Sequence, residues 1–501
     1  MISTPDLPDD IATLKALLVA RDDRIDRLEK LVAEFKRALF GKRSERLDPE
    51  QMELAFEDIE AAIAVVEAEG EDQDFVQAKP KPSSKPRPLP QHLPRIETVV
   101  EPESTTCDCG AKRHVIGEDV SERLDIIPAQ FRVLVTRRPR YACRSCEAGV
   151  VQVPAPVHLI EAGLPTEATL ATIIVSKHAD HLPLFRQSQI YARQGVEIER
   201  STLAGWLGRA AYALRPISEA LLANLRQSTK LFMDETTVPV LDPGRGRTKT
   251  GYFWALARDD RTWAGPEPPA VAFTYAPGRS GKYASEILGP FEGTLQVDGY
   301  TGYNRLRDAR HDGDIQLAYC WAHARRKLYE LTVNNVAPIA EDGLKQIAAL
   351  YRIESRIRGL SAEERGAARQ DASAPKVAAF HVWLAAARSQ VSAKSPTGEA
   401  LKYIARYWDG LTLFLEDGRV EMDSNPVERT IRAIALNRKN ALFAGHDEGA
   451  RNWATCATLI ETCKLNKIEP HAYLTGVLTA IARGHKQRDI EKLLPWNFQV
   501  A

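Results

Sequence analysis

Residues 231–240 read LFMDETTVPV, an apolar strand-like run interrupted by two carboxylates, and the predicted fold is organised around it. Two more strand-like segments follow at 252–257 and 270–275, joined by loops rich in Gly, Arg and Pro. A helical pattern at 282–288 leads to a further strand at 294–300, TLQVDGY. Three strands, a helix and another strand are typical of the beginning of a mixed α/β sheet.

Three acidic residues stand out by their positions in these elements. Asp234 lies inside the first strand, Asp298 ends a later strand, and Glu428 opens a predicted helix after the turn 423–426. A carboxylate beside a sheet core is costly unless it is paired or bound to metal. Converging on one edge, the three would suit Mg²⁺ or Mn²⁺, and two such ions about 3.5–4 Å apart can promote phosphodiester displacement. Each acid alone is equally well explained as a capping or salt-bridged residue, and Glu428 fits the helix dipole without metal.

Other polar residues near these acids are candidate DNA contacts. His323 and Arg326 lie three residues apart on one predicted helix, where they either face the acids and touch a phosphate or serve as packing and surface residues. Arg438 and Lys439 follow the Glu428 helix, where they either hold a DNA backbone or form a surface turn.

Four of the seven cysteines fall in two close pairs. Cys107 and Cys109 form a C-x-C pair, and Cys143 and Cys146 form a C-x₂-C pair after a strand-like segment at 131–141. Two such thiolate pairs can close a tetrahedral structural zinc site, and the metal would fold a ribbon whose own core is too small. Four buried thiols are the alternative.

The N-terminal segment has the periodicity of a coiled coil. Its seam positions alternate three and four residues apart, and eight of the nine are apolar: Ile11, Leu14, Leu18, Arg21, Ile25, Leu28, Val32, Phe35 and Leu39. This heptad pattern predicts self-association. A single amphipathic helix packed on its own domain is the alternative. An acidic stretch and then a Pro-rich basic stretch follow, which is typical of a linker.

Residues 161–226 are predicted to form a helical DNA-binding unit. Helices are expected at 166–179, after Pro183, and at 200–214, with a Gly-containing break at 195–198. Helix, turn and helix is the outline of a helix-turn-helix, although any helical bundle contains such joints. Ser201 and Thr202, at the start of the last helix, are the candidate DNA contacts.

Composition excludes a membrane-embedded protein. The 501 residues include 67 Lys or Arg and 67 Asp or Glu, and no stretch approaches the ~20 apolar residues needed to cross a bilayer. No secretory signal is visible at the N-terminus, so we expect a cytoplasmic protein. The zero net charge does not argue against a polyanionic partner, because local patches decide that question.

The motifs, taken in order, resemble bacterial insertion-sequence transposases of family sixty-six. The residues that carry the resemblance run along nearly the whole chain: the heptad helix, Leu39–Arg46 (LFGKRSER), the two cysteine pairs, His181–Leu184 (HLPL), Ser201–Leu203, Asp234–Thr236, Val297–Tyr300, Cys320–Arg326 (CWAHARR), Glu428-Arg429 and Pro470–Leu474 (PHAYL). One departure is that the family often has Asp-Asn-Asn where this chain has Asp423-Ser424-Asn425.

The resemblance implies an RNase H-like catalytic domain of the DDE type, interrupted by a helical insertion before its glutamate. Asp234, Asp298 and Glu428 would be its metal-binding triad. Family members cut at the ends of their element and join the freed 3′-hydroxyls to target DNA. They are encoded beside two small accessory proteins.

The expected fold class is therefore multidomain α+β. The expected parts are a coiled-coil helix at 10–47, an acidic and Pro-rich linker at 48–98, a zinc-binding ribbon at 99–160, the helix-turn-helix unit at 161–226, the RNase H-like domain at 227–335 and 419–450 with its helical insertion at 336–418, and a helical tail at 451–501.

The leading functional hypothesis is a DNA transposase that binds the terminal inverted repeats of an insertion sequence and acts on them and on target DNA with Mg²⁺ or Mn²⁺. Zinc would be structural, the coiled coil would join two or more protomers, and accessory proteins of the same element could take part. We expect it in the cytoplasm, associated with the nucleoid. The alternative is a zinc-containing DNA-binding regulator or inactive transposase derivative, and a third reading is a plain nuclease of the same fold.

Overall fold

The computed structural model describes residues 91–92, 94–97, 99, 121, 123–125, 129–142, 150–161, 163–242, 244–304, 306, 314–332 and 337–499. The chain divides into two compact units, one of which comprises residues 77–137. All the helices and the sheet described below belong to the other unit. The predicted coiled coil, most of the linker and the four paired cysteines lie outside the described residues.

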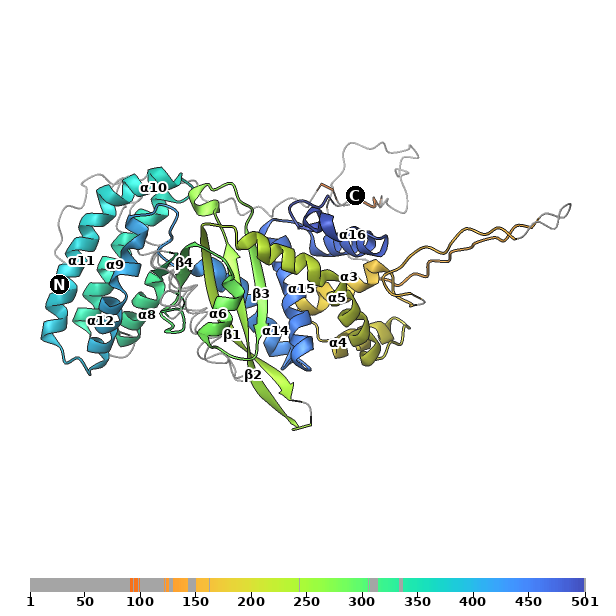
Figure 1. Ribbon diagram of the computed structural model, residues 1–501, viewed down its shortest axis with the longest axis horizontal. Helices are drawn as coiled ribbons and strands as arrows, with labels where there is room; N and C mark the ends of the chain where they lie inside the picture. The colour runs from red at the N-terminus through yellow and green to blue at the C-terminus, as the bar shows by residue number, and fades with distance from the viewer. Residues whose placement is uncertain are drawn as a thin grey trace, which may run out of the picture. The chain divides into compact units, whose positions relative to one another are not determined.

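A five-stranded mixed sheet forms the centre of the larger unit (Figure 1). Its strands are β1 (Lys230–Asp242), β2 (Arg247–Arg258), β3 (Ala270–Ala276), β4 (Gly293–Val297) and β5 (Ile315–Tyr319). Their spatial order is β3-β2-β1-β4-β5. Strands β1, β2 and β3 pair with one another in antiparallel fashion, whereas β4 runs parallel to β1 and β5 parallel to β4. The three strands, helix and further strand expected from the sequence are all present.

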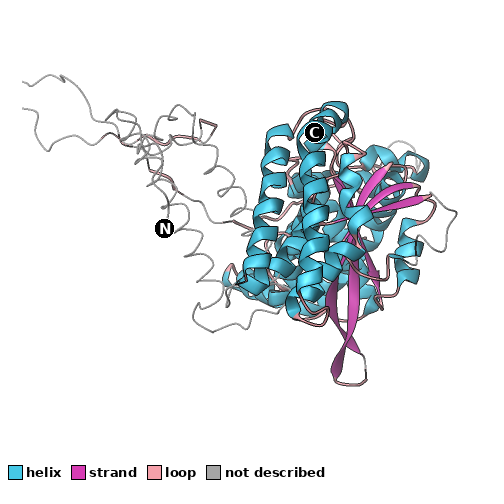
Figure 2. Ribbon diagram, turned by 90° about the vertical axis from the view of Figure 1, so that its left-hand side faces the viewer, coloured by secondary structure: helices cyan, strands magenta, loops and turns pink. Residues whose placement is uncertain are grey.

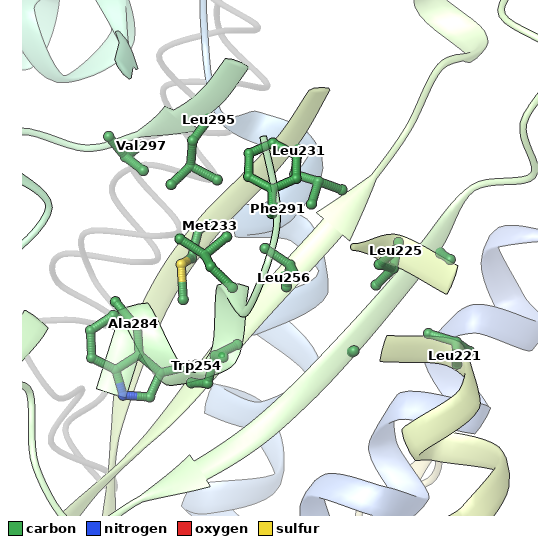
Figure 3. Packing of buried hydrophobic residues seen from close by; sticks show 14 of the residues in the cluster. Leu221, Leu225, Leu231, Met233, Trp254, Leu256, Ala284, Phe291, Leu295 and Val297 are labelled. Carbon is green, nitrogen blue, oxygen red and sulfur yellow. The ribbon is translucent and has the colours of Figure 1, made fainter. Parts of the chain in front are cut away.

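Both faces of the sheet are buried, because apolar residues occupy both sides of the pleat. On one face Leu231 and Met233 of β1 pack with Trp254 and Leu256 of β2 (Figure 3). Helices α5 (Arg200–Leu225) and α6 (Gly281–Leu288) contribute to the cluster on this face. On the other face Phe232, Val238 and Val240 form a second cluster with side chains of α14 (Asn425–Ala441) and α15 (Asp447–Leu465). The sheet is thus sandwiched between helices, as Figure 2 shows.

A helical insertion lies between β5 and α14 in the chain. It contains α8 (Trp321–Thr332), α9 (Pro338–Ile357), α10 (Ala362–Ala368), α11 (Ala374–Gln390), α12 (Pro396–Arg406) and α13 (Trp408–Thr412). Helix α10 begins with a capping box, in which Ser361 and Glu364 satisfy each other's backbone N–H groups. The helices of the expected insertion, 336–418, therefore form between the last strand and the Glu428 helix.

The expected helix-turn-helix unit contains α3 (Glu167–His178), α4 (Leu184–Arg193) and α5. Helix α5 continues to Leu225, past the expected end at Leu214, because its apolar face extends through Ile217 and Leu221. Its N-cap is Glu199, which makes no side-chain cap hydrogen bond.

The C-terminal helices pack directly on these elements. Helix α3 contacts α16 (Pro470–Ala482), and α15 contacts both α5 and β3. One hydrophobic cluster joins side chains from all of these segments. The expected boundary between residues 450 and 451 falls inside α15. This helix packs on β3 of the sheet, so the tail is not separate from the sheet at this point.

The strand expected at 131–141 does not form. This segment makes a single antiparallel bridge, Tyr141 to Val151, and its apolar side chains are exposed, as at Val133 and Val135. A strand requires a continuous ladder partner, and one bridge does not supply it. Within the part of the chain that the structure describes, no helix is both long and apolar enough to cross a membrane.

Candidate active site

Strand register brings Asp234 and Asp298 to equivalent positions. Phe232 of β1 is the partner of Gln296 in the parallel strand β4. Asp234 and Asp298 each follow this pair by two residues, Asp234 within β1 and Asp298 just after β4 ends, where the two strands have stopped pairing. The register thus aligns the two positions, and Asp298 is near enough to contribute to the raised pKa of Asp234.

Glu428 reaches this edge because the turn before α14 is tied to the strands. The Gln296 amide donates to the carbonyl of Glu421 at 2.9 Å and accepts from the Glu421 N–H at 2.9 Å. The Trp321 N–H, just after β5, donates to the Met422 carbonyl at 2.8 Å. Helix α14 then starts with Glu428 in its first turn and packs on the Asp234 face of β1.

The charges at this edge are crowded. Burial, and then the neighbouring carboxylates Glu235, Asp298 and Glu428, raise the pKa of Asp234 well above its usual value. Burial and repulsion from Glu421 and Glu428 likewise raise the pKa of Asp423 to about 7. Carboxylates that repel one another in a partly buried site are suited to hold hard divalent cations, which oxygen ligands bind. The donor set therefore fits Mg²⁺ or Mn²⁺.

Glu428 also belongs to a tighter cluster on its other side. Among the described residues, one set of possible metal ligands has atoms that all lie within 4.8 Å of one another, namely Cys320, His323 and Glu428. The hydroxyl of Ser424 donates to Glu428 Oε1 at 2.6 Å. Asp234 and Asp298 are outside this set, so the three acids do not converge on a single point. Acids that serve two ions can lie farther apart than the ligands of one ion.

Glu235 was not singled out in the sequence analysis, although it is adjacent to Asp234. Strand alternation turns it to the opposite face, where its side chain is 1% exposed. It accepts hydrogen bonds from Tyr303 and from Arg279, each at 2.5 Å. The sequence indicates this residue only as the second of two successive carboxylates in an apolar strand. Its partners Arg279 and Tyr303 are distant in the sequence and are identified only by the folded structure.

The remaining candidate DNA contacts occupy different environments. His323 has a ring nitrogen within 4.8 Å of ligand atoms of Cys320 and Glu428. Arg326 is buried in α8, and Lys439 is half-buried near the end of α14. Ser201 and Thr202 are exposed at the start of α5.

Arg438 does not occupy the surface position expected of a phosphate contact. Its guanidinium is buried and donates to the backbone carbonyl and hydroxyl of Thr237 in β1. It therefore ties α14 to the strand that carries Asp234, and its hydrogen-bonding groups are used inside the protein.

Comparison with known families accounts for most of the chain. The family model described as "Transposase IS66 family" matches residues 162–452, a range that contains all three acids. The model described as "IS66 C-terminal element" matches 458–496, and "zinc-finger binding domain of transposase IS66" matches 104–147. The model described as "Transposase C of IS166 homeodomain" matches 27–98, which extends over the acidic and Pro-rich stretch expected to be a linker.

Similar proteins of nearly the same length occur in Sinorhizobium fredii. The uncharacterized protein y4qI is 44% identical, over 98% of this chain and 92% of its own length. The uncharacterized protein y4jD is 42% identical, over 98% of this chain and 97% of its own. The uncharacterized protein y4hP is 37% identical, over 95% of this chain and 89% of its own length.

Proposed function

Because the chain belongs to the IS66 transposase family, we propose that it is a DDE-type DNA transposase in which Asp234, Asp298 and Glu428 hold the catalytic metal ions. The observation that carries this proposal is the register of β1 and β4, which sets Asp234 beside Asp298 on the face that α14 covers. The strand order, with three antiparallel strands followed by two parallel ones, supports an RNase H-like catalytic domain.

The protein's own groups have distinct tasks in this proposal. Asp234, whose pKa is raised by burial and by its acidic neighbours, would hold a divalent cation, whose charge would offset that repulsion. Ser424 orients the Glu428 carboxylate through its 2.6 Å hydrogen bond. Bound Mg²⁺ or Mn²⁺ would activate a water or a 3′-hydroxyl and stabilise the leaving oxygen.

The remaining parts of the chain would recognise and pair the DNA ends. The zinc-finger match supports a structural zinc ion, for which Cys107, Cys109, Cys143 and Cys146 are the proposed ligands. The ribbon and the helices at 161–226 would bind the terminal inverted repeats, and the heptads would join at least two protomers, because two ends must meet. The site of action would be chromosomal DNA in the cytoplasm, with accessory proteins of the same element as possible partners.

Purified protein incubated with Mn²⁺ and labelled DNA that carries the inverted repeats flanking its reading frame tests the catalytic proposal. The unaltered protein should cut the repeat end and join the freed 3′-hydroxyl to a second DNA. Asp298→Asn should abolish both products and keep DNA binding, because it removes an ionised ligand and little else.

Asp342→Asn, on the exposed side of α9, is the matched control and should retain both products. Sequence-specific binding without any cutting by the unaltered protein would instead identify a DNA-binding regulator or inactive derivative. Cutting without a joined product would identify a nuclease. If the Asp298→Asn variant still cuts the DNA, Asp298 is not one of the metal ligands that the reaction needs.

A further inference from the structure

A large groove lies at the far end of α14 from the carboxylates. It has a volume of about 1670 Å³, and its walls come from α4, α5 and the segment 440–449 that joins α14 to α15. Sites for small molecules usually have volumes of about 300–1000 Å³, so this groove is large enough for several units of a polymer. The exposed face of α5 that begins with Ser201 lines it.

Three aromatic side chains from three different elements line the groove. Phe185 of α4 is 56% exposed, Tyr212 of α5 is 71% exposed and Phe443, after α14, is 42% exposed. Large exposed apolar groups that gather in one hollow usually mark a binding surface. Aromatic rings in a groove are the platforms on which unpaired nucleic-acid bases stack.

The charges of the groove suit a polyanion. Arg186, Arg200 and Arg209 line it, and all three are exposed. Two acidic residues, Glu199 and Glu448, also line it, and the Glu448 carboxylate is already engaged by two arginines, Arg215 and Arg451. Positively charged side chains along a groove with aromatic walls are the combination that follows a nucleic-acid backbone.

The α5 wall of the groove is smooth because it carries two glycines one turn apart. A Cβ added at Gly205 would meet nothing within 4 Å, and one at Gly208 would come no closer than 3.9 Å to the Asn452 side chain. Internal packing therefore does not require glycine here, although glycine is a poor helix former. Glycine in such a position permits the close approach of a ligand.

Leu442 projects from the segment that closes the groove. It is 66% exposed, and its backbone has φ 64° and ψ −49°, in the left-handed half of conformational space that disfavours a side chain. The surroundings hold it there: its N–H donates to the Arg438 carbonyl at 2.9 Å, and Ala444 bonds to Pro239 of β1 at 2.9 Å. An exposed apolar side chain fixed in this way resembles the wedges that unstack base pairs.

We propose that this groove binds unpaired nucleotides at the DNA end being processed. Phe185, Tyr212 and Phe443 stack the bases, the arginines hold the phosphates, and Leu442 keeps the strands apart. The inference rests on the proposed function, which supplies the DNA end. Within α14, the stretch from Glu428 to Ala441 rises about 20 Å, which is the length of about six nucleotides of a duplex strand.

Photo-cross-linking tests the location of the nucleotides. The full-length protein is irradiated with a short single-stranded oligonucleotide that contains 4-thiothymidine, and the linked peptides are identified by mass spectrometry. Peptides that contain Tyr212 or Phe443 should carry the label. Labels confined to other parts of the chain would overturn the proposal.

Substitution tests the stacking contacts. Tyr212→Ala and Phe443→Ala should each weaken binding of the unlabelled single strand by between about five- and 150-fold, and should weaken binding of a blunt duplex much less. Equal losses for both DNA forms, or no loss for either, would contradict a site for unpaired nucleotides.

Gly205 offers a matched pair of variants. Gly205→Phe should obstruct the α5 wall of the groove, where the strand approaches, and strongly reduce the cross-links, whereas Gly205→Ala should keep them and raise the melting temperature, because alanine is the better helix former. If Gly205→Phe unfolds the protein, the comparison rests on Tyr212→Ala and Phe443→Ala. Cross-links that persist in a folded Gly205→Phe protein would overturn the proposal.

Asp298→Asn separates this inference from the proposed function. It should retain the groove cross-links and lose cutting. If it cuts normally while the groove is labelled, the catalytic assignment fails and the groove remains. If it loses cutting while the unaltered protein shows no groove label, the groove fails and the catalytic assignment remains.

Discussion

Asp234 and Glu235 are neighbours in the sequence with opposite environments. Glu235 accepts hydrogen bonds from Arg279 and Tyr303 within the fold, although burial and the nearby Asp298 still raise its pKa. The charged groups that raise the pKa of Asp234 are the carboxylates of Glu235, Asp298 and Glu428. A bound divalent cation would offset their repulsion. The two environments differ because successive side chains of a β-strand point to opposite faces of the sheet.

Ser424 is the residue whose side chain positions Glu428. Ser424→Ala removes the 2.6 Å hydrogen bond and should raise the Mn²⁺ concentration needed for half-maximal cutting, or lower the cutting rate, by about 10- to 100-fold. Ser424→Asn, which restores a donor, should recover most of the loss. Metal titrations of DNA nicking measure both. Equal behaviour of the alanine and asparagine variants would show that the hydrogen bond has no part in the reaction.

Asp423 makes stability depend on pH. Its pKa rises from an ordinary 3.8 to about 7 in the folded chain, so the folded state favours the protonated form. Its contribution to stability is therefore present below about pH 4 and is lost as the pH rises through 7. Without added Mg²⁺, Asp423→Asn should stabilise the protein increasingly between pH 5 and 8, by at most about 4 kcal/mol. Urea unfolding measures this, and a pH-independent difference would contradict it.

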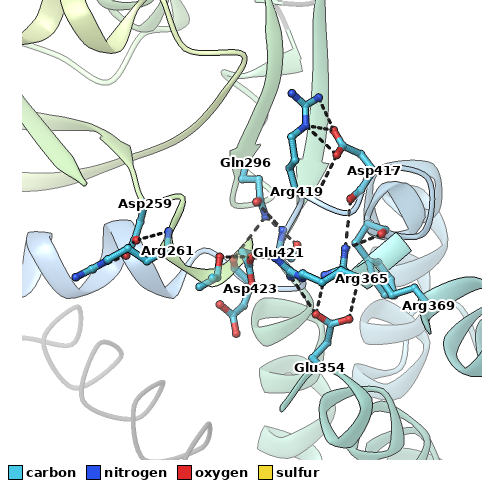
Figure 4. Close-up of polar contacts among 12 residues, drawn as sticks. Asp259, Arg261, Gln296, Glu354, Arg365, Arg369, Asp417, Arg419, Glu421 and Asp423 are labelled. Atoms are coloured by element: carbon cyan, nitrogen blue, oxygen red, sulfur yellow. Dashed lines mark hydrogen bonds and ion pairs between the residues drawn. The ribbon is translucent and has the colours of Figure 1, made fainter. Parts of the chain in front are cut away.

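At the scale of elements, a buried ion network fastens the insertion helices to the turn that leads to Glu428 (Figure 4). Arg365 of α10 donates to Glu421 at 2.8 Å, and Arg369 binds Glu354 of α9 through two hydrogen bonds of 2.7 and 2.6 Å. Burial would raise the pKa of Glu421, but the nearby cations Lys230 and Arg365 outweigh it and lower that pKa. Helices α9 and α10 thus support the position of the turn that leads into α14.

Breaking this network should cost far more than breaking a surface pair. Arg365→Met leaves buried carboxylates uncompensated and should lower the free energy of unfolding by about 3–5 kcal/mol, part of which Arg365→Met with Glu421→Gln should restore. Lys282→Ala, which breaks the exposed pair with Glu286, should cost less than about 1 kcal/mol. Urea unfolding compares them, and equal losses for Arg365→Met and Lys282→Ala would show that the network adds no stability.

At the scale of the whole molecule, the question is how two DNA ends are brought together. The three acids and the groove lie in the larger unit, whereas the heptad segment lies outside the described residues. The family match at 27–98 overlaps the later heptads and is named for a homeodomain, a DNA-binding type of fold. The heptads and this match are compatible if the N-terminal segment both pairs protomers and contacts DNA.

Placing charges on the heptad seam tests pairing. Leu28→Glu with Val32→Glu should give monomers by light scattering, because charged side chains cannot pack in a coiled-coil seam. Lys30→Glu with Ala33→Glu, at positions off the seam, should leave the oligomer intact. Persistent dimers in the seam variant would place the association elsewhere in the chain.

Much of the fold and of the candidate site was predictable because it is local. The apolar run at 231–240 predicted β1, and the helix that carries Glu428 in its first turn begins at the expected turn. The strand predicted at 131–141 was wrong, because strand propensity without a partner does not make a sheet. The end of α5 was also misjudged, since its extension depends on what it packs against.

The amino-acid sequence by itself determined the family, the order of the elements and which acids could matter, because these follow from motifs and from periodicity along the chain. Only the tertiary structure decided which acids meet. In the folded chain Phe232 pairs with Gln296, and Glu235 points to the opposite face of the sheet from Asp234. Arg438 is buried and hydrogen-bonded to β1. Register, burial and long-range hydrogen bonds join residues far apart in the chain, and no local pattern specifies them.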